Sequence, residues 1–290
     1  MKYLKNAIAL LLAIAFIAPA AALPSYRLEG TYPDNAPIVT PDFDGNGENS
    51  GEVLPPNEPN EPNEPNEPNE PMPEPEPEPI IAQYIKCTGE SVNIRSGAGT
   101  GFSVLGVAEK NTTYAVVEKT GNWYKTFYRN KTAYVYASYA AIFSIEQSEK
   151  EEVENVISEA YKLIGVPYVY GAVRLHDGNG KLLAGFTAQK FDCSSLVQYV
   201  FYKGAGKLLQ VTTRTQVKQG KYVAKKDLQR GDCLFFTNES RKHLTGVERI
   251  GHVAIYLGNN YILHTASDYA RIEQISNTRW SHYVEARRFL

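Results

Sequence analysis

Apolar residues recur every three or four positions between residues 149 and 164, which predicts an amphipathic helix. The buried face of this helix would consist of Val153, Val156, Ile157, Ala160 and Ile164. Ser148 and Glu151 have the spacing of a capping box at its start, and Gly165 marks its end. We expect this helix to pack in a core and to take no part in chemistry.

A second helix is predicted to begin after Asp192, a residue type that accepts hydrogen bonds from the first free N–H groups of a helix. It would end at Gly204 and bury four apolar residues, Leu196, Val197, Val200 and Phe201. Cys193 falls in its first turn. The unpaired N–H groups and the dipole of a helix start favour a thiolate at this position.

Two strand-like runs flank residues 258–260, whose Gly-Asn-Asn sequence is typical of a turn. With a three-residue loop, Leu257 pairs with Tyr261, and His264 falls on the same face as His252. A two-residue loop would turn His264 to the opposite face. The sequence therefore predicts two neighbouring imidazoles, on the condition that the loop has three residues.

Short alternating runs separated by turns occupy residues 83–141, and their spacing predicts a small all-β barrel. The runs cover residues 91–95, 114–117, 123–124 and 132–135. The barrel contains no candidate nucleophile, so we expect it to contribute to binding, with a passive structural role as the alternative. We expect the rest of the chain to cut small substrates without it.

The N-terminus has the layout of a secretory signal peptide over residues 1–22. Lys2 and Lys5 precede an apolar run at residues 7–18, and three alanines follow at residues 20–22. An uncleaved membrane anchor is the alternative, but the apolar run is short for a bilayer span. We therefore expect a secreted protein, extracellular or associated with the cell wall, with no membrane span after the signal is removed.

Residues 23–79 have the composition of a disordered region, and from Pro55 to Pro79 they repeat Asn-Glu-Pro and then Glu-Pro. Proline lacks a backbone donor and the glutamates repel one another, which predicts an extended acidic spacer. An acidic turn at residues 42–47 has part of the pattern of a calcium loop. Because Val53 stands where a bidentate glutamate is needed, we expect no metal ion there or elsewhere in the chain.

Charge is divided unevenly along the chain. Residues 1–79 hold three of the 30 basic and 14 of the 32 acidic residues, so residues 80–290 carry a formal charge of plus nine. A basic surface suits an anionic partner such as a cell-wall polymer. Nucleic acid is not expected as a partner, because the basic residues are scattered and no nucleic-acid-binding motif occurs. We also expect a monomer that needs no cofactor.

The three cysteines differ in their surroundings. Cys87 and Cys233 lie in apolar, strand-like runs and are expected to be core residues, whereas Cys193 has polar neighbours at a helix start. With His252 and His264, Cys193 supplies a nucleophile, a base and an orienting group in that chain order. Cys193 would attack an amide carbonyl as half of a thiolate–imidazolium pair, His252 would move the proton, and His264 would orient His252.

Residues 149–290 resemble the NlpC-type cell-wall peptidases, papain-like cysteine enzymes that cut the short peptides of bacterial peptidoglycan. The matching stretches are residues 167–171, 191–194, 230–236, 251–258 and 284–288. Residues 83–141 resemble the bacterial Src-homology-three domains. The resemblance implies an α+β fold, in which a papain-like catalytic domain of helices packed on an antiparallel sheet follows a small all-β Src-homology-three-like barrel.

The same resemblance implies an endopeptidase that cleaves peptidoglycan stem peptides in the bacterial cell wall, at the bond between γ-D-glutamate and the diamino acid. Tyr168, Asp192 and Ser194 match positions that line the donor side of the cleft in relatives, and Arg214 is a weaker match. An N-acetylmuramoyl-L-alanine amidase of the related Cys-His enzymes and a non-catalytic wall-binding protein remain as alternatives.

Three departures from the family pattern affect the substrate subsites more than the reaction. Tyr170 and Ala172 replace the usual Trp and Gly, Ser195 replaces the usual Gly, and an insertion occupies residues 173–190. A turn sequence at residues 177–180 predicts that the insertion forms a hairpin flap over the cleft. The histidines outside the matching stretches are expected to lie in solvent, and they are His176, His243 and His282.

Overall fold

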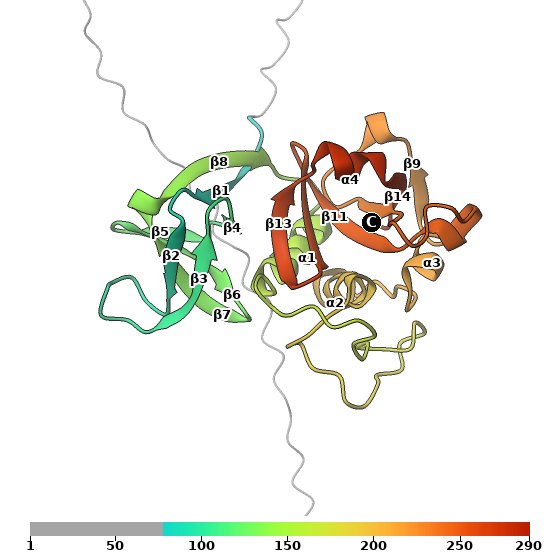
Figure 1. Cartoon of the computed structure of the whole chain (residues 1–290), viewed down its shortest axis with the longest axis horizontal. Coiled ribbons are helices and arrows are strands. Elements are labelled where there is room, and N and C mark those ends of the chain that lie inside the picture. The colour runs from blue at the N-terminus through green and yellow to red at the C-terminus, as the bar shows by residue number, and fades with distance from the viewer. Residues whose placement is uncertain (1–77) are drawn as a thin grey trace, which may run out of the picture. The chain divides into compact units, whose positions relative to one another are not determined.

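The computed structural model describes residues 78–290 (Figure 1). The predicted signal peptide, the calcium-like turn at residues 42–47 and all but the last two residues of the predicted acidic spacer lie outside the described residues. Within residues 78–290, no helix is both long enough and apolar enough to cross a membrane.

The first part of the described chain consists almost entirely of short strands, as expected for a small all-β domain. Strands β2, β3, β5, β6 and β7 form a five-stranded antiparallel sheet in the order β3-β2-β7-β6-β5, and β1 lies between β8 and β4 in a second sheet. The elements are β1 (Ile81–Cys87), β2 (Ser91–Arg95), β3 (Val104–Glu109), β4 (Thr113–Ala115), β5 (Glu118–Thr120), β6 (Trp123–Tyr128), β7 (Lys131–Tyr136), the 3₁₀ turn η1 (Ala137–Tyr139) and β8 (Ala140–Glu146).

The second part packs helices on the continuation of this second, antiparallel sheet, in which β4 is followed by the strands β13-β12-β11-β10-β14-β9. Together the two parts give the α+β architecture expected from the sequence. The helices are α1 (Glu151–Lys162), α2 (Cys193–Ala205), α3 (Thr213–Gln216), η2 (Lys225–Asp227), η3 (Gly246–Arg249) and α4 (Asn277–Ser281). The strands are β9 (Lys221–Val223), β10 (Cys233–Phe236), β11 (His252–Gly258), β12 (Tyr261–Ala266), β13 (Tyr269–Gln274) and β14 (Tyr283–Arg288).

Helix α1 buries the apolar face that its sequence period predicts, but the predicted capping box is wrong. Lys150 occupies the N-cap position and makes no side-chain cap. The backbone N–H of Ser148 donates to Glu154, one turn further than Glu151, and the Ser148 hydroxyl accepts from Lys150. Glu154 accepts this hydrogen bond in place of Glu151 because its carboxylate is also bound by the Arg230 guanidinium. That tertiary contact cannot be predicted from the local sequence.

Helix α2 begins as predicted. The Asp192 side chain accepts from the N–H of Ser195, and the Ser195 hydroxyl accepts from the N–H of Asp192. The helix runs past its predicted end and stops at Gly206, which has the left-handed conformation of a C-cap. Gly204 is needed for packing instead, because a Cβ there would lie 2.5 Å from the backbone of Val156 in α1.

The hairpin of β11 and β12 has the predicted alignment of side chains, but its loop differs from the predicted one. Gly258, not Leu257, pairs with Tyr261, so the loop has two residues, and the predicted three-residue loop is wrong. A bulge shifts the register between Tyr256 and Gly258, so that Ile255 pairs with Leu263. The bulge adds the residue that the shorter loop removes, and the side-chain parity of the two strands is preserved.

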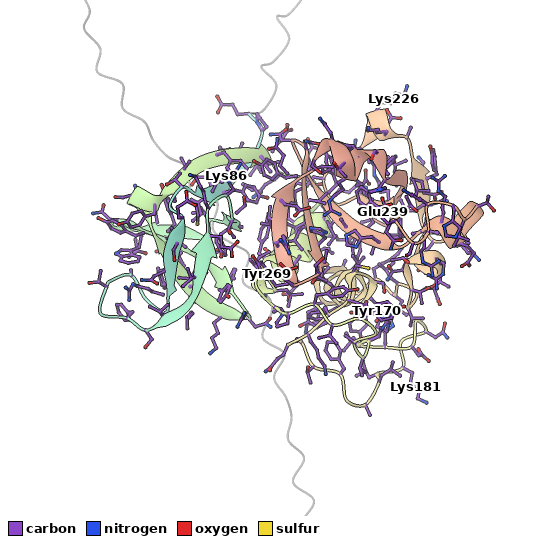
Figure 2. All side chains as sticks on the ribbon, in the orientation of Figure 1. Lys86, Tyr170, Lys181, Lys226, Glu239 and Tyr269 are labelled. Carbon is purple, nitrogen blue, oxygen red and sulfur yellow. The ribbon has the colours of Figure 1, made fainter. Side chains whose placement is uncertain are left out.

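The insertion at residues 173–190 contains a short hairpin. His176 pairs with Leu182 around a turn in which the backbone N–H of Asp177 donates to the backbone carbonyl of Lys181, a residue labelled in Figure 2. The expectation of a solvated His176 is wrong: the residue is fully buried, and its ring packs against Tyr202 of α2. His243 is exposed as expected, and His282 is half-buried, with Nε2 3.1 Å from a carboxylate oxygen of Glu239.

Candidate active site

Cys193 is the first residue of α2, and 8% of it is exposed. The backbone N–H groups of Val253 and Ser194 interact with its sulfur and act to lower the pKa of the thiol. Val253 follows His252 at the start of β11, so this interaction joins the start of the helix to the start of the strand that carries the candidate base. Two segments separated by about sixty residues therefore meet where the sequence predicted that the chemistry would lie.

The two candidate histidines form a hydrogen-bonded pair. His252 Nε2 lies 2.8 Å from His264 Nδ1, and the rings meet nearly edge to face with centroids 5.0 Å apart. This contact requires the two side chains to share one face of the sheet, which is what the bulged hairpin provides. His264 is fully buried, so its orientation is fixed by the core around it.

A carboxylate and a guanidinium continue this chain of contacts. His264 Nε2 lies 3.2 Å from Glu273 Oε1, an ion-pair distance at which the N–H is not well aligned for a hydrogen bond. The same Glu273 oxygen lies 2.7 Å from Arg279 of α4. Burial would raise the pKa of Glu273, but its interaction with His264, followed by the charges of Arg279 and Arg271, lowers that pKa to about 2. Sequence reasoning missed both residues, because their place beside His264 depends on strand pairing with β13.

Burial favours the neutral form of both reacting groups. It raises the pKa of the Cys193 thiol to about 12, with a further contribution from the Asp192 carboxylate. Burial also lowers the pKa of His252 well below its ordinary value, and the nearby His264 and Arg279 act in the same direction. Desolvation therefore acts against the expected thiolate–imidazolium pair, whereas the backbone N–H groups at the helix start act in its favour.

Three of the four candidate substrate residues gather around the nucleophile. Asp192 and Ser194 flank it in the chain, and the Ser194 hydroxyl donates to Asp192. Tyr168 pairs with Phe191 just before this turn, and its pKa is raised by burial and by the nearby Cys193 and Asp192.

Arg214 does not join this cluster through any contact in residues 78–290. It lies on α3 and faces Glu248 at 3.4 Å.

Arg174, at the start of the insertion, is a third residue that sequence reasoning missed. Its guanidinium lies 2.8 Å from Asp192 and 3.2 Å from the Ser194 hydroxyl, and it also donates to the carbonyl of Val211. The only sequence signal was an arginine three residues beyond the matching stretch that contains Tyr168. Among the described residues, no group of three His, Cys, Asp or Glu side chains is placed to hold a metal ion.

Two family models match the chain. Residues 165–288 match the NlpC/P60 family, and residues 90–141 match the bacterial SH3 domain. The first match covers the helix of Cys193 and the strands of both histidines, and the second covers most of the all-β domain.

The chain is similar to several curated proteins over its C-terminal half. It is 35% identical over 136 residues to the gamma-DL-glutamyl hydrolase of Bacillus subtilis, and this alignment covers 46% of the chain and 29% of the relative. It is 30% identical over 123 residues to the peptidoglycan endopeptidase RipB of Mycobacterium tuberculosis, and this alignment covers 42% of the chain and 47% of the relative. The chain thus spans less than half the length of these two relatives.

Solved structures of the same family are also similar. A protein of the NLP/P60 family from Staphylococcus aureus is 28% identical and aligns with a TM-score of 0.40. The alignment covers 50% of this chain and 43% of that chain.

Proposed function

Because residues 165–288 form an NlpC/P60 domain and a bacterial SH3 domain precedes it, we propose that this protein is a cysteine peptidase that cuts the stem peptides of peptidoglycan. One observation carries the proposal: the sulfur of Cys193 is held against the start of β11, where His252 is hydrogen-bonded to His264. A nucleophile, a base and an orienting group in one place are the requirements of nucleophilic amide hydrolysis.

The reaction begins from neutral groups. As Cys193 Sγ attacks the scissile carbonyl carbon, the thiol proton moves to His252, and the carbonyl oxygen becomes an oxyanion near the N–H groups at the start of α2. The C–N bond then breaks and His252 returns the proton to the leaving amine. The remaining thioester is hydrolysed by water, and His252 again moves the proton. His264 keeps the His252 ring in position through the 2.8 Å contact.

The bond proposed for cleavage joins γ-D-glutamate to the diamino acid. The similarity to a gamma-DL-glutamyl hydrolase and to a peptidoglycan endopeptidase favours this bond. We assign Tyr168, Asp192 and Ser194 to the donor side, because they surround the nucleophile. Arg214 is a weaker candidate, since its partner is Glu248.

The bacterial SH3 domain is proposed to bind the cell wall or to frame the substrate, and the protein is proposed to act outside the cytoplasm, in or near the wall. The formal charge of plus nine over residues 80–290 would favour contact with anionic wall polymers. The match to the bacterial SH3 domain and the similarity to a peptidoglycan endopeptidase support both assignments.

Mass spectrometry of digested muropeptides tests the function directly. We expect a new free γ-carboxyl on D-glutamate and a new free amine on the diamino acid, and no such products with the Cys193→Ala variant. Products with a free L-alanine amine would support an amidase instead. The absence of new termini, together with retained binding to sacculi, would support a non-catalytic wall-binding protein.

A further inference from the structure

A small polar pocket of about 170 Å³ is separated from the His252 ring by Phe236. Its closest link to the active site is Phe236, which pairs with His252 across the sheet and holds its ring 6.1 Å from the His252 ring. The residues that line the pocket with Phe236 are Thr237, Ser276, Thr278, Arg279 and His282. Since a water molecule occupies roughly 30 Å³, the pocket has room for about five heavy atoms.

The lining of the pocket suits a carboxylate. Arg279 supplies a guanidinium that is 27% exposed, and Glu273 is its one ion-pair partner in the described residues, through Nη2. Thr237 supplies a buried hydroxyl without a hydrogen-bond partner in that same part of the chain. The two nearby carboxylates are already engaged: Glu273 by Arg279, and Glu239 by Lys242 and His282. A guanidinium and a hydroxyl around a small space form a binding site for an anionic group.

The position of the pocket indicates which part of a substrate would reach it. In the proposed mechanism His252 returns a proton to the leaving amine, so the residue that carries this amine must pass beside the His252 ring. The pocket adjoins that ring through Phe236. The side chain of the leaving residue is therefore the substrate part nearest to Arg279.

We propose that this pocket is the subsite for the leaving diamino acid and that Arg279 and Thr237 bind a carboxylate at the end of its side chain. The inference rests on the proposed function and makes it more specific. Diaminopimelate carries such a carboxylate, whereas lysine ends in an amine alone. The enzyme should therefore prefer stem peptides with a free diaminopimelate carboxylate over peptides in which this group is amidated or absent.

Three synthetic tetrapeptides test this preference. They have the form L-Ala-γ-D-Glu-X-D-Ala, where X is meso-diaminopimelate, its side-chain monoamide or L-lysine. A hydrogen bond to a charged group contributes enough to change kcat/KM by roughly ten- to hundredfold, so we expect the full-length enzyme to favour the free carboxylate by that factor. Equal kcat/KM values for all three peptides would overturn the subsite while leaving the peptidase function in place. Failure to cut any of them would overturn the proposed function, and the subsite with it.

Two arginines provide a matched pair of variants. Arg279 and Arg271 both act electrostatically on His264 and Glu273, but only Arg279 lines the pocket. Arg271 instead pairs with Asp268. We expect Arg279→Gln to bring the ratio of kcat/KM between the acid and amide peptides close to one, and Arg271→Gln to keep the wild-type ratio even if its overall rate falls.

A second substitution at the same position serves as a control in case Arg279→Gln misfolds. Arg279→Lys keeps the positive charge and should retain most of the preference for the free carboxylate. An unchanged ratio in a folded Arg279→Gln enzyme would overturn the proposal, as would an equal loss of preference in Arg271→Gln.

Discussion

At the scale of single residues, Cys193 stands apart from the other two cysteines by its place at a helix start. Cys87 and Cys233 are fully enclosed in β1 and β10, and burial alone accounts for most of the increase in their pKa values. We predict that Cys193→Ala lowers kcat by roughly 10⁴-fold or more, because the thiol is the nucleophile. Muropeptide turnover measures the loss. Cys233→Ala should keep its activity, and a similar loss in both variants would point to a structural effect.

The two histidines should differ in their tolerance to substitution. His252→Ala removes the group that moves the proton, so we expect a loss as large as that of Cys193→Ala. His264→Asn still offers a polar partner to His252 across the 2.8 Å contact and should keep a measurable part of the activity. Rates of peptide hydrolysis by the two variants give the comparison. Wild-type turnover by His252→Ala would exclude it as the base.

The buried environment of His252 also fixes the acid side of the pH profile. Burial lowers its pKa well below 6.5, and the enzyme needs this imidazole neutral to accept a proton. Because a lowered pKa keeps the ring neutral as the pH falls, kcat/KM should stay near its plateau down to pH values below 6.5. Measurement of kcat/KM across this range checks the prediction. An acid limb centred at or above pH 6.5 would contradict it.

At the scale of elements, Asp192 joins helix capping to the active site. Its side chain accepts from the Ser195 N–H and also faces Arg174 at 2.8 Å. Asn can replace Asp as an N-cap but Ala cannot, so Asp192→Ala should destabilise the protein by about 1 kcal/mol more than Asp192→Asn. Urea denaturation measures the difference. Equal stabilities of the two variants would mean that the cap contributes little.

The hairpin shows how far parity reasoning extends. Alternation along β11 and β12 predicted that His252 and His264 share one face only on the condition of a three-residue loop, and the shared face is present although that condition is not met. The loop length could not be obtained in the same way. Asn259 and Asn260 both have positive φ angles in a two-residue turn, and a bulge before Gly258 compensates for the shorter loop. A loop length and a bulge can cancel, so a correct register did not require a correct loop.

Local patterns predicted the helix faces, the Asp192 cap and the buried Cys87 and Cys233. They did not predict partners from distant segments, since such contacts depend on tertiary packing. Arg174 reaches Asp192 only after the insertion folds, and Glu273 reaches His264 only when β13 pairs with β12. His176 is a similar case, because its ring is buried by Tyr202 of α2.

At the scale of the whole described chain, the all-β part and the catalytic part share one sheet. Thr113 of β4 pairs with Ile272 of β13, which gives the continuous order β8-β1-β4-β13-β12-β11-β10-β14-β9. The expectation that the catalytic part would work without the first 141 residues therefore needs revision. Removing them would expose the edge of β13 and would leave Arg230 without its Tyr84 partner.

Arg230 is the centre of the polar contact between the two parts. Its side chain is only 5% exposed and is bound by Glu154, by Tyr161 and by the Tyr84 hydroxyl at 2.8 Å. Tyr84 and Tyr161 also share a hydrogen bond. A buried charge that loses a partner is costly, so this cluster should make the two parts unfold together.

We predict that Tyr84→Phe lowers the stability of both parts, by about 1–3 kcal/mol, because the buried Arg230 and Tyr161 each lose a partner. For a chain of this size that corresponds to a decrease in Tm of roughly 2–10 °C.

The two tryptophans report on the two parts separately, since Trp123 lies in β6 and Trp280 in α4. Single Trp→Phe variants should give coincident fluorescence transitions that shift together when Tyr84→Phe is added. Tyr136→Phe is the matched control, because the Tyr136 hydroxyl makes no hydrogen bond within residues 78–290, although its ring also contacts Trp123. Separate transitions, or a shift in the Trp123 signal alone, would show that the two parts unfold independently and that the Arg230 cluster does not couple them.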